Sequence, residues 1–295
     1  MRSRSARHST HLEEILRLDP EKDHKRIVYL DVCYEFPWDT TRSLELALFR
    51  TFAVPSIGRL LDSAGGFHHD SQKRYDDTDL LISTMLEDGY DSPSGHAALR
   101  RMNQIHRHFP ISNNDYLYVL STFVFEPIRW NERFGWRRMV EQERLANFYC
   151  WREIGRRMNV RDIPGSYSAF EHFNRSYELQ HFSPSDATQR VGIAGRDMFL
   201  GWCPRITRGL ATQAIYSLLD DELLKAFGFP SPSPVARRLV VGSLRGRAHV
   251  LRWLPPRHQA RLRTRIKHRT YPRGYRIEAL GPDSLSSLEK GRTED

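Results

Sequence analysis

Residues 99–110 read LRRMNQIHRHFP and indicate most clearly how this chain folds. Their apolar side chains recur three or four positions apart, at Leu99, Met102, Ile105 and Phe109. That spacing places them on one face of an α-helix, which Pro110 ends. His106 falls on the same face. The stretch therefore predicts an amphipathic helix with a histidine in its apolar surface.

The same periodicity recurs along most of the chain, and strand patterns are nearly absent. Asp19 and Pro20 resemble the start of a helix, and Ser94 resembles the cap of another. Further helices are expected at 40–64, 72–88, 115–125, 141–158, 166–181, 184–201 and 207–226. Leu239–Val241 is too short to found a sheet. We predict an all-α, multi-helix bundle.

The chain divides into four parts by composition. Residues 1–18 form a basic N-terminal tail, partly disordered, and 19–230 form the main domain. Pro230 and Pro234 mark a linker. Residues 231–281 are expected to be a basic helical extension, and 282–295 a disordered tail.

The net charge of +9 is concentrated near the C-terminus. Residues 237–276 hold 13 Lys or Arg and no Asp or Glu. Such a stretch can face an anionic membrane or nucleic acid, or be a solvated helix face. Neither a signal peptide nor a run of about 20 apolar residues is visible. We expect a cytoplasmic protein, with possible peripheral membrane contact and no nucleic acid.

Several enzyme classes lack their motifs here. The sequence has no GxGxxG after a strand, no GxxxxGK[ST], no GxSxG and no HExxH.

What remains is a helical protein with 13 histidines. A neutral imidazole in an apolar wall suits a haem iron, although a histidine in such a face is more often an ordinary core residue. His108 competes with His106, but it lies about 200° around the helix.

Three stretches in order resemble the MpaB/latex-clearing-protein (rubber oxygenase) family. They are the Pro55-containing helix with its Gly65–Gly66 turn, KRYDDT at 73–78, and RRMNQIHRHF at 100–109. Three later segments also match the family sequence in the same order: DYLYVLSTF at 115–123, the helix at 143–160 and DIP at 162–164. The resemblance covers residues 20–230.

The resemblance implies a globin-like helical core around haem b, with His106 as the ligand of the iron. Arg74 and Thr78, four residues apart and so on one helix face, would lie at the haem. Met102 and Phe109 would line its pocket. The implied activity is a dioxygen-dependent oxygenase or dioxygenase acting on a hydrophobic small molecule, such as an isoprenoid or lipid.

Two departures from the family concern the substrate. The segment 118–121 lacks the Trp-x-His pattern of many members. The rubber-cleaving branch has a glutamate upstream of the Arg/Thr pair, where this chain offers only Asp62. We therefore expect a smaller substrate than polyisoprene.

Two other function classes stay open from the residues alone. The Glu-x-x-His pairs Glu21/His24 and Glu178/His181 have the spacing used in di-iron bundles. Alternatively, the chain is a non-enzymatic basic helical protein that binds a membrane surface or nucleic acid through residues 237–276.

Overall fold

The computed structural model describes residues 9–64 and 70–282, and every regular element in these ranges is helical. The α-helices are α1 (Thr10–Ile15), α2 (His24–Leu30), α3 (Pro37–Thr51), α4 (Pro55–Ser63), α6 (Ser71–Thr84), α7 (Pro93–His106), α8 (Asn113–Phe134), α9 (Glu141–Arg157), α10 (Tyr167–His181), α11 (Asp186–Leu200), α12 (Arg208–Leu218), α13 (Asp221–Phe227) and α14 (Pro234–Leu251). Wide π-helical turns are η1 (Asp31–Glu35) and η2 (Met85–Gly89), and 3-10 turns are η3 (Arg205–Thr207), η4 (Arg263–Arg265) and η5 (Ile277–Ala279). The all-α prediction is confirmed.

Some of the predicted features lie in segments that the structure does not describe. The Gly65–Gly66 turn lies outside the described residues, as do 1–8 and 283–295 of the two expected tails. None of the described helices is long and apolar enough to cross a bilayer.

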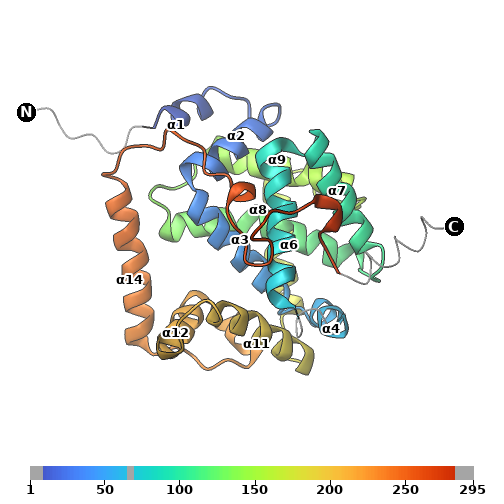
Figure 1. Cartoon of the computed structure of the whole chain (residues 1–295), viewed down its shortest axis with the longest axis vertical. Helices are drawn as coiled ribbons and strands as arrows, with labels where there is room; N and C mark the ends of the chain where they lie inside the picture. Colours follow the sequence, from blue (N-terminus) through green and yellow to red (C-terminus); the bar gives the residue numbers. More distant parts are fainter. Residues whose placement is uncertain (1–8, 65–69, 283–295) are drawn as a thin grey trace, which may run out of the picture.

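Helix α8 is the centre of the fold (Figure 1). Consecutive residues along it are buried, which means that all its sides are covered rather than a single stripe. Helices α3, α9, α10 and α14 pack against it. The apolar stretch 115–125 predicted this helix, but α8 begins earlier, capped by Ser112, and continues past Pro127 to Phe134.

Pro127 can lie inside α8 because α9 supplies the missing hydrogen bonds. A proline has no N–H to give to the carbonyl four residues earlier, here that of Phe123. The Asn147 side-chain amide donates instead to the carbonyl oxygens of Val124, at 2.8 Å, and Phe123, at 3.4 Å. The two central helices are thus joined where buried carbonyls would otherwise lack donors.

Two predicted helix starts are wrong by a few residues. The Asp19 carboxylate accepts from the N–H groups of Glu21 and Lys22, which makes a local turn, and α2 begins only at His24. In α7 the cap is Ser92 rather than Ser94, because Pro93 takes the first helical position.

The predicted helical extension at 231–281 is α-helical only from Pro234 to Leu251, in α14, and beyond it holds just the short 3-10 turns η4 and η5. This helix forms the left edge of the molecule in Figure 1 and packs on α12 and α8. Beyond it, Pro255–Pro256 and Pro272 cannot donate the N–H groups that a continuous helix needs. The chain instead returns as an irregular strap, residues 252–282, which crosses α6 (Figure 1).

The strap is held by carboxylates of α6. The Asp79 carboxylate binds the Arg263 guanidinium at 2.6 Å. Asp76 accepts from the Thr270 N–H at 2.8 Å, and Asp77 accepts from the Gly281 N–H at 3.0 Å. Buried carboxylates need such partners, so α6 and the strap depend on each other.

We predict that Gly95→Ala strongly destabilises the chain. A Cβ at Gly95 would lie 2.0 Å from the Gly89 carbonyl oxygen and 2.8 Å from the Tyr90 Cα, and backbone atoms cannot move aside as side-chain ends can. We expect a loss of about 3 kcal/mol or more in the free energy of unfolding. Thermal or urea denaturation followed by circular dichroism measures it.

Gly242→Ala is the control for this substitution. Nothing lies within 4 Å of a Cβ there, in the middle of α14, so the better helix propensity of alanine should stabilise the chain by about 0.5–1 kcal/mol. Equal effects of the two substitutions would contradict the packing argument.

Candidate functional site

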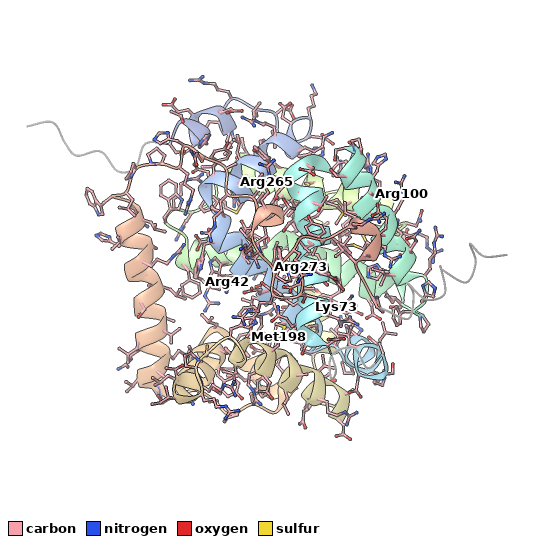
Figure 2. All side chains as sticks on the ribbon, in the orientation of Figure 1. Arg42, Lys73, Arg100, Met198, Arg265 and Arg273 are labelled. Carbon is pink, nitrogen blue, oxygen red and sulfur yellow. The ribbon has the colours of Figure 1, made fainter. Side chains whose placement is uncertain are left out.

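A cavity of about 860 Å³ lies between helices α3, α4, α6, α7, α8, α9 and α11. Most of its wall is apolar, and the end of the strap, Gly281 and Pro282, completes it. Figure 2 labels two lining residues from distant parts of the sequence, Lys73 on α6 and Met198 on α11. The volume is near the upper end of the range of about 300–1,000 Å³ usual for small-molecule sites.

The structure brings all five predicted site residues to this cavity. They are Arg74 and Thr78 from α6, Met102 and His106 from α7, and Phe109, which follows α7. Because α6 and α7 are neighbours in the fold, two helix faces that the sequence marked separately meet at one space.

His106 lies at the last turn of α7 with its ring edge against Tyr116 of α8, at a centroid distance of 5.5 Å. Its Nδ1 atom is buried and has no hydrogen-bond partner. Buried polar atoms are nearly always paired, so this exception requires an explanation, and a bound group that is absent from the structure is one. The competing His108 is exposed, and its Nδ1 is 2.8 Å from the Gln104 carbonyl oxygen. Of the two, only His106 lines the cavity.

The cavity keeps the His106 imidazole neutral. Burial, and secondarily the positive charge of Arg74, lower the pKa of His106 to about 4. Near neutral pH the ring therefore retains a free lone pair, as a metal ligand must.

Arg74 is a cation in an apolar wall. Burial lowers the pKa of its guanidinium, and the carboxylate of Asp77 opposes that effect. Thr78, one turn further along α6, presents a hydroxyl to the same cavity. An anion or a polar oxygen inside the cavity would find both donors on one helix face.

Among the polar residues of the cavity that were not predicted from the sequence are Lys73 and Glu45. Lys73 donates to Asp77 at 2.9 Å and also to the Gly281 carbonyl oxygen of the strap. Glu45 of α3 accepts from the Tyr75 hydroxyl at 2.6 Å and from Arg42 at 2.6 Å. In the sequence, Glu45 is an acidic residue between the apolar residues Leu44 and Leu46, which is a weak indication of a functional role. Only the fold shows that Glu45 lines the cavity.

Glu45 is the carboxyl group here that titrates near neutral pH. Burial raises its pKa to about 7, opposed by the nearby Arg42 charge and the Tyr75 hydrogen bond. Asp62, the acid noted upstream of Arg74 in the sequence, does not line the cavity but forms an ion pair with Arg190 at 2.6 Å.

The described residues do not support the di-iron alternative. Glu178 is bound by Arg50 at 2.6 Å, while the His24 ring bonds to the Glu21 carbonyl oxygen and the Tyr90 hydroxyl. His181 turns back to the Tyr177 carbonyl oxygen. Within residues 9–64 and 70–282, no three His, Cys, Asp or Glu side chains gather as metal ligands would.

Comparison with known proteins gives one family. The profile described as "ER-bound oxygenase mpaB/B'/Rubber oxygenase, catalytic domain" matches residues 44–253. ER-bound oxygenase mpaB' of Penicillium brevicompactum is 28% identical over 246 residues, which are 77% of this chain and 58% of that protein. ER-bound oxygenase mpaB of Penicillium roqueforti is 26% identical over 210 residues, 65% of this chain and 70% of that protein.

A third relative, ER-bound oxygenase mpaB of Penicillium brevicompactum, is 32% identical over 145 residues, 46% of this chain and 37% of that protein. The chain thus spans less than two thirds of the length of two of these three relatives.

We predict that His106→Leu changes how the stability of the ligand-free chain depends on pH. The pKa of His106 is about 4 in the folded chain and about 6.5 when unfolded, so its contribution to stability is fully present above pH 6.5 and is lost as pH falls towards 4. Leucine cannot be protonated. The difference in unfolding free energy between variant and parent should therefore shift in favour of the variant between pH 6.5 and pH 4.

His108→Leu is the matched control, because His108 is exposed and lies outside the cavity. Urea denaturation at several pH values measures both variants. Parallel pH curves for His106→Leu and the parent would mean that the ring is not held neutral by burial.

Proposed function

The chain belongs to the mpaB/B' and rubber oxygenase family, and from this premise we propose that it is a haem-b-dependent oxygenase with His106 as the iron ligand. The observation that carries the proposal is the unpartnered, buried Nδ1 of a neutral imidazole in the wall of a cavity of about 860 Å³.

The residues of the cavity fit haem b. Haem is a flat, mostly apolar group that carries two carboxylates, and in many proteins a histidine nitrogen binds its iron. Met102 and Phe109 flank His106 on the apolar side, and the buried cation of Arg74 suits a propionate carboxylate. When bound, haem supplies the redox-active iron at which dioxygen reacts.

The chain itself would bind and orient the haem and the substrate, and it would exclude water from them. The apolar walls from α4, α8 and α11 keep the site dry, which strengthens every polar interaction inside it. The Thr78 hydroxyl is a hydrogen-bond donor for an oxygen atom near Arg74. The Glu45 carboxyl, which is partly ionised near neutral pH, can accept or return a proton in contact with Tyr75.

We propose a hydrophobic substrate of isoprenoid or other lipid character. Leu60, Leu81 and Phe123 come from three different helices and offer apolar contacts on several sides of the cavity. A molecule of this class enters such a cavity because its burial removes apolar surface from water. The proposed substrate is a small molecule and not a polymer chain.

The non-enzymatic alternative is not favoured. The family match extends to residue 253 and so includes all of α14. Several basic residues of 237–276 are used inside the fold, since Arg247 binds Asp39 at 2.9 Å and Arg263 binds Asp79. Cytoplasmic location and peripheral membrane contact remain part of the proposal.

The first test is the ultraviolet–visible spectrum of the chain expressed with ample haem. We expect a strong Soret band that is lost or shifted in His106→Ala and kept in His108→Ala, because only His106 lines the cavity. A folded parent that shows no Soret band, even after haem is added, would overturn the proposal.

A second test concerns Glu45. With a pKa near 7, its carboxyl is mostly neutral below that pH and mostly ionised above it. Dioxygen consumption by the haem-loaded chain, with squalene as the apolar probe, should change through a step near pH 7 in the parent. We expect Glu45→Gln to lack the step. Glu132→Gln, at an exposed position away from this cavity, should keep it.

A further inference from the structure

A second cavity lies between the C-terminal end of α8 and the helix α14, and its lining is dominated by arginine. Its volume is about 360 Å³. Five arginines line it, together with one acidic residue, Glu132. The arginines are Arg133, Arg137, Arg138, Arg245 and Arg252.

Two of these arginines have structural partners. Arg137 is bound by the buried carboxylates of Glu35, at 2.7 Å, and Glu143, at 2.5 Å. Arg252 gives its Nε–H to the Trp136 carbonyl oxygen at 2.6 Å, which fixes the side chain and leaves its terminal nitrogens for another partner.

The other three arginines form no ion pair among the residues that the structure describes. Arg133 lies over the ring of Phe134, with its central carbon 4.7 Å from the ring centroid. Burial lowers the pKa of the Arg133 guanidinium, and the charge of Arg245 is one of the smaller effects that lower it further, while Glu126 and Asp220 oppose the shift. Cations that gather from two separate elements repel one another unless an anion lies between them.

This cavity is separate from the one at His106. Tyr116 contacts the His106 ring near the start of α8, and Arg133 lies 17 residues further along the same helix. At about 1.5 Å per residue the two sites are roughly 25 Å apart. The arginine cavity therefore does not supply the substrate cavity directly.

We propose that the arginine cavity binds a phosphate group. Arginine forks bind phosphate oxygens through two parallel hydrogen bonds. Arg138, from the segment after α8, and Arg245, from α14, both line the cavity. The group can belong to a soluble phosphorylated molecule or to an anionic lipid. Trp253 of the same region is 60% exposed and would contact a bilayer interface in the second case.

The test uses the full chain and inorganic pyrophosphate as the probe, measured by isothermal titration calorimetry at low and moderate salt. We expect binding that weakens with salt and falls at least about 10-fold in the double variant Arg138→Ala/Arg245→Ala, since two charge-assisted contacts are lost. Both residues are exposed, and neither forms an ion pair that the fold needs.

Arg238→Ala is the matched control. Arg238 is an exposed arginine on α14, two turns before Arg245, and it does not line the cavity. The control loses a positive charge from the same helix. If it weakens pyrophosphate binding as much as Arg245→Ala alone does, binding reflects diffuse charge and the site is overturned.

Vesicle sedimentation separates the two sources of phosphate. If the ligand is a lipid, vesicles with phosphatidylglycerol should pellet the parent, pure phosphatidylcholine should not, and the double variant should stay in solution. If it is a soluble molecule, pyrophosphate binds while pelleting is the same for parent and double variant. Unchanged pyrophosphate binding and unchanged pelleting in the double variant would refute the proposal, whatever the haem content of the chain.

Discussion

The arrangement of this fold depends on the pairing of buried carboxylates on α6 with the strap that follows α14. Asp76, Asp77 and Asp79 are carried by the same helix that carries Arg74 and Thr78. An unpaired buried carboxylate is costly, so α6 can take its place beside the cavity only if the strap supplies N–H groups and a guanidinium. The strap in turn has few helical hydrogen bonds of its own and is ordered by these contacts.

What the sequence could predict was local. The apolar spacing around His106 and the four-residue interval between Arg74 and Thr78 are properties of single helices, and both groups face the cavity. The all-α class followed from the same periodicity. Helix starts were less certain because a short side chain can cap a turn as readily as a helix, as Asp19 does.

What the sequence could not predict was long-range. Glu45 reaches the cavity because α3 packs on α8, and Lys73 meets Gly281 across 208 positions of sequence. The basic stretch 237–276 is one feature in the sequence but has two roles in the fold. Arg247 and Arg263 neutralise internal carboxylates, whereas Arg138, from outside that stretch, joins Arg245 at a second cavity. Charge counts do not distinguish paired from unpaired cations.

The position of Gly281 and Pro282 in the cavity wall has a consequence for the order of synthesis. A chain is made from its N-terminus, and helices α3 to α11 can leave the ribosome and begin to pack while the strap is still being made. The cavity then lacks part of its wall, and the carboxylates of α6 lack their partners. A ligand that needs the complete wall would be retained only after residues 281 and 282 have been made, and its loading would then be a late event in the maturation of the chain.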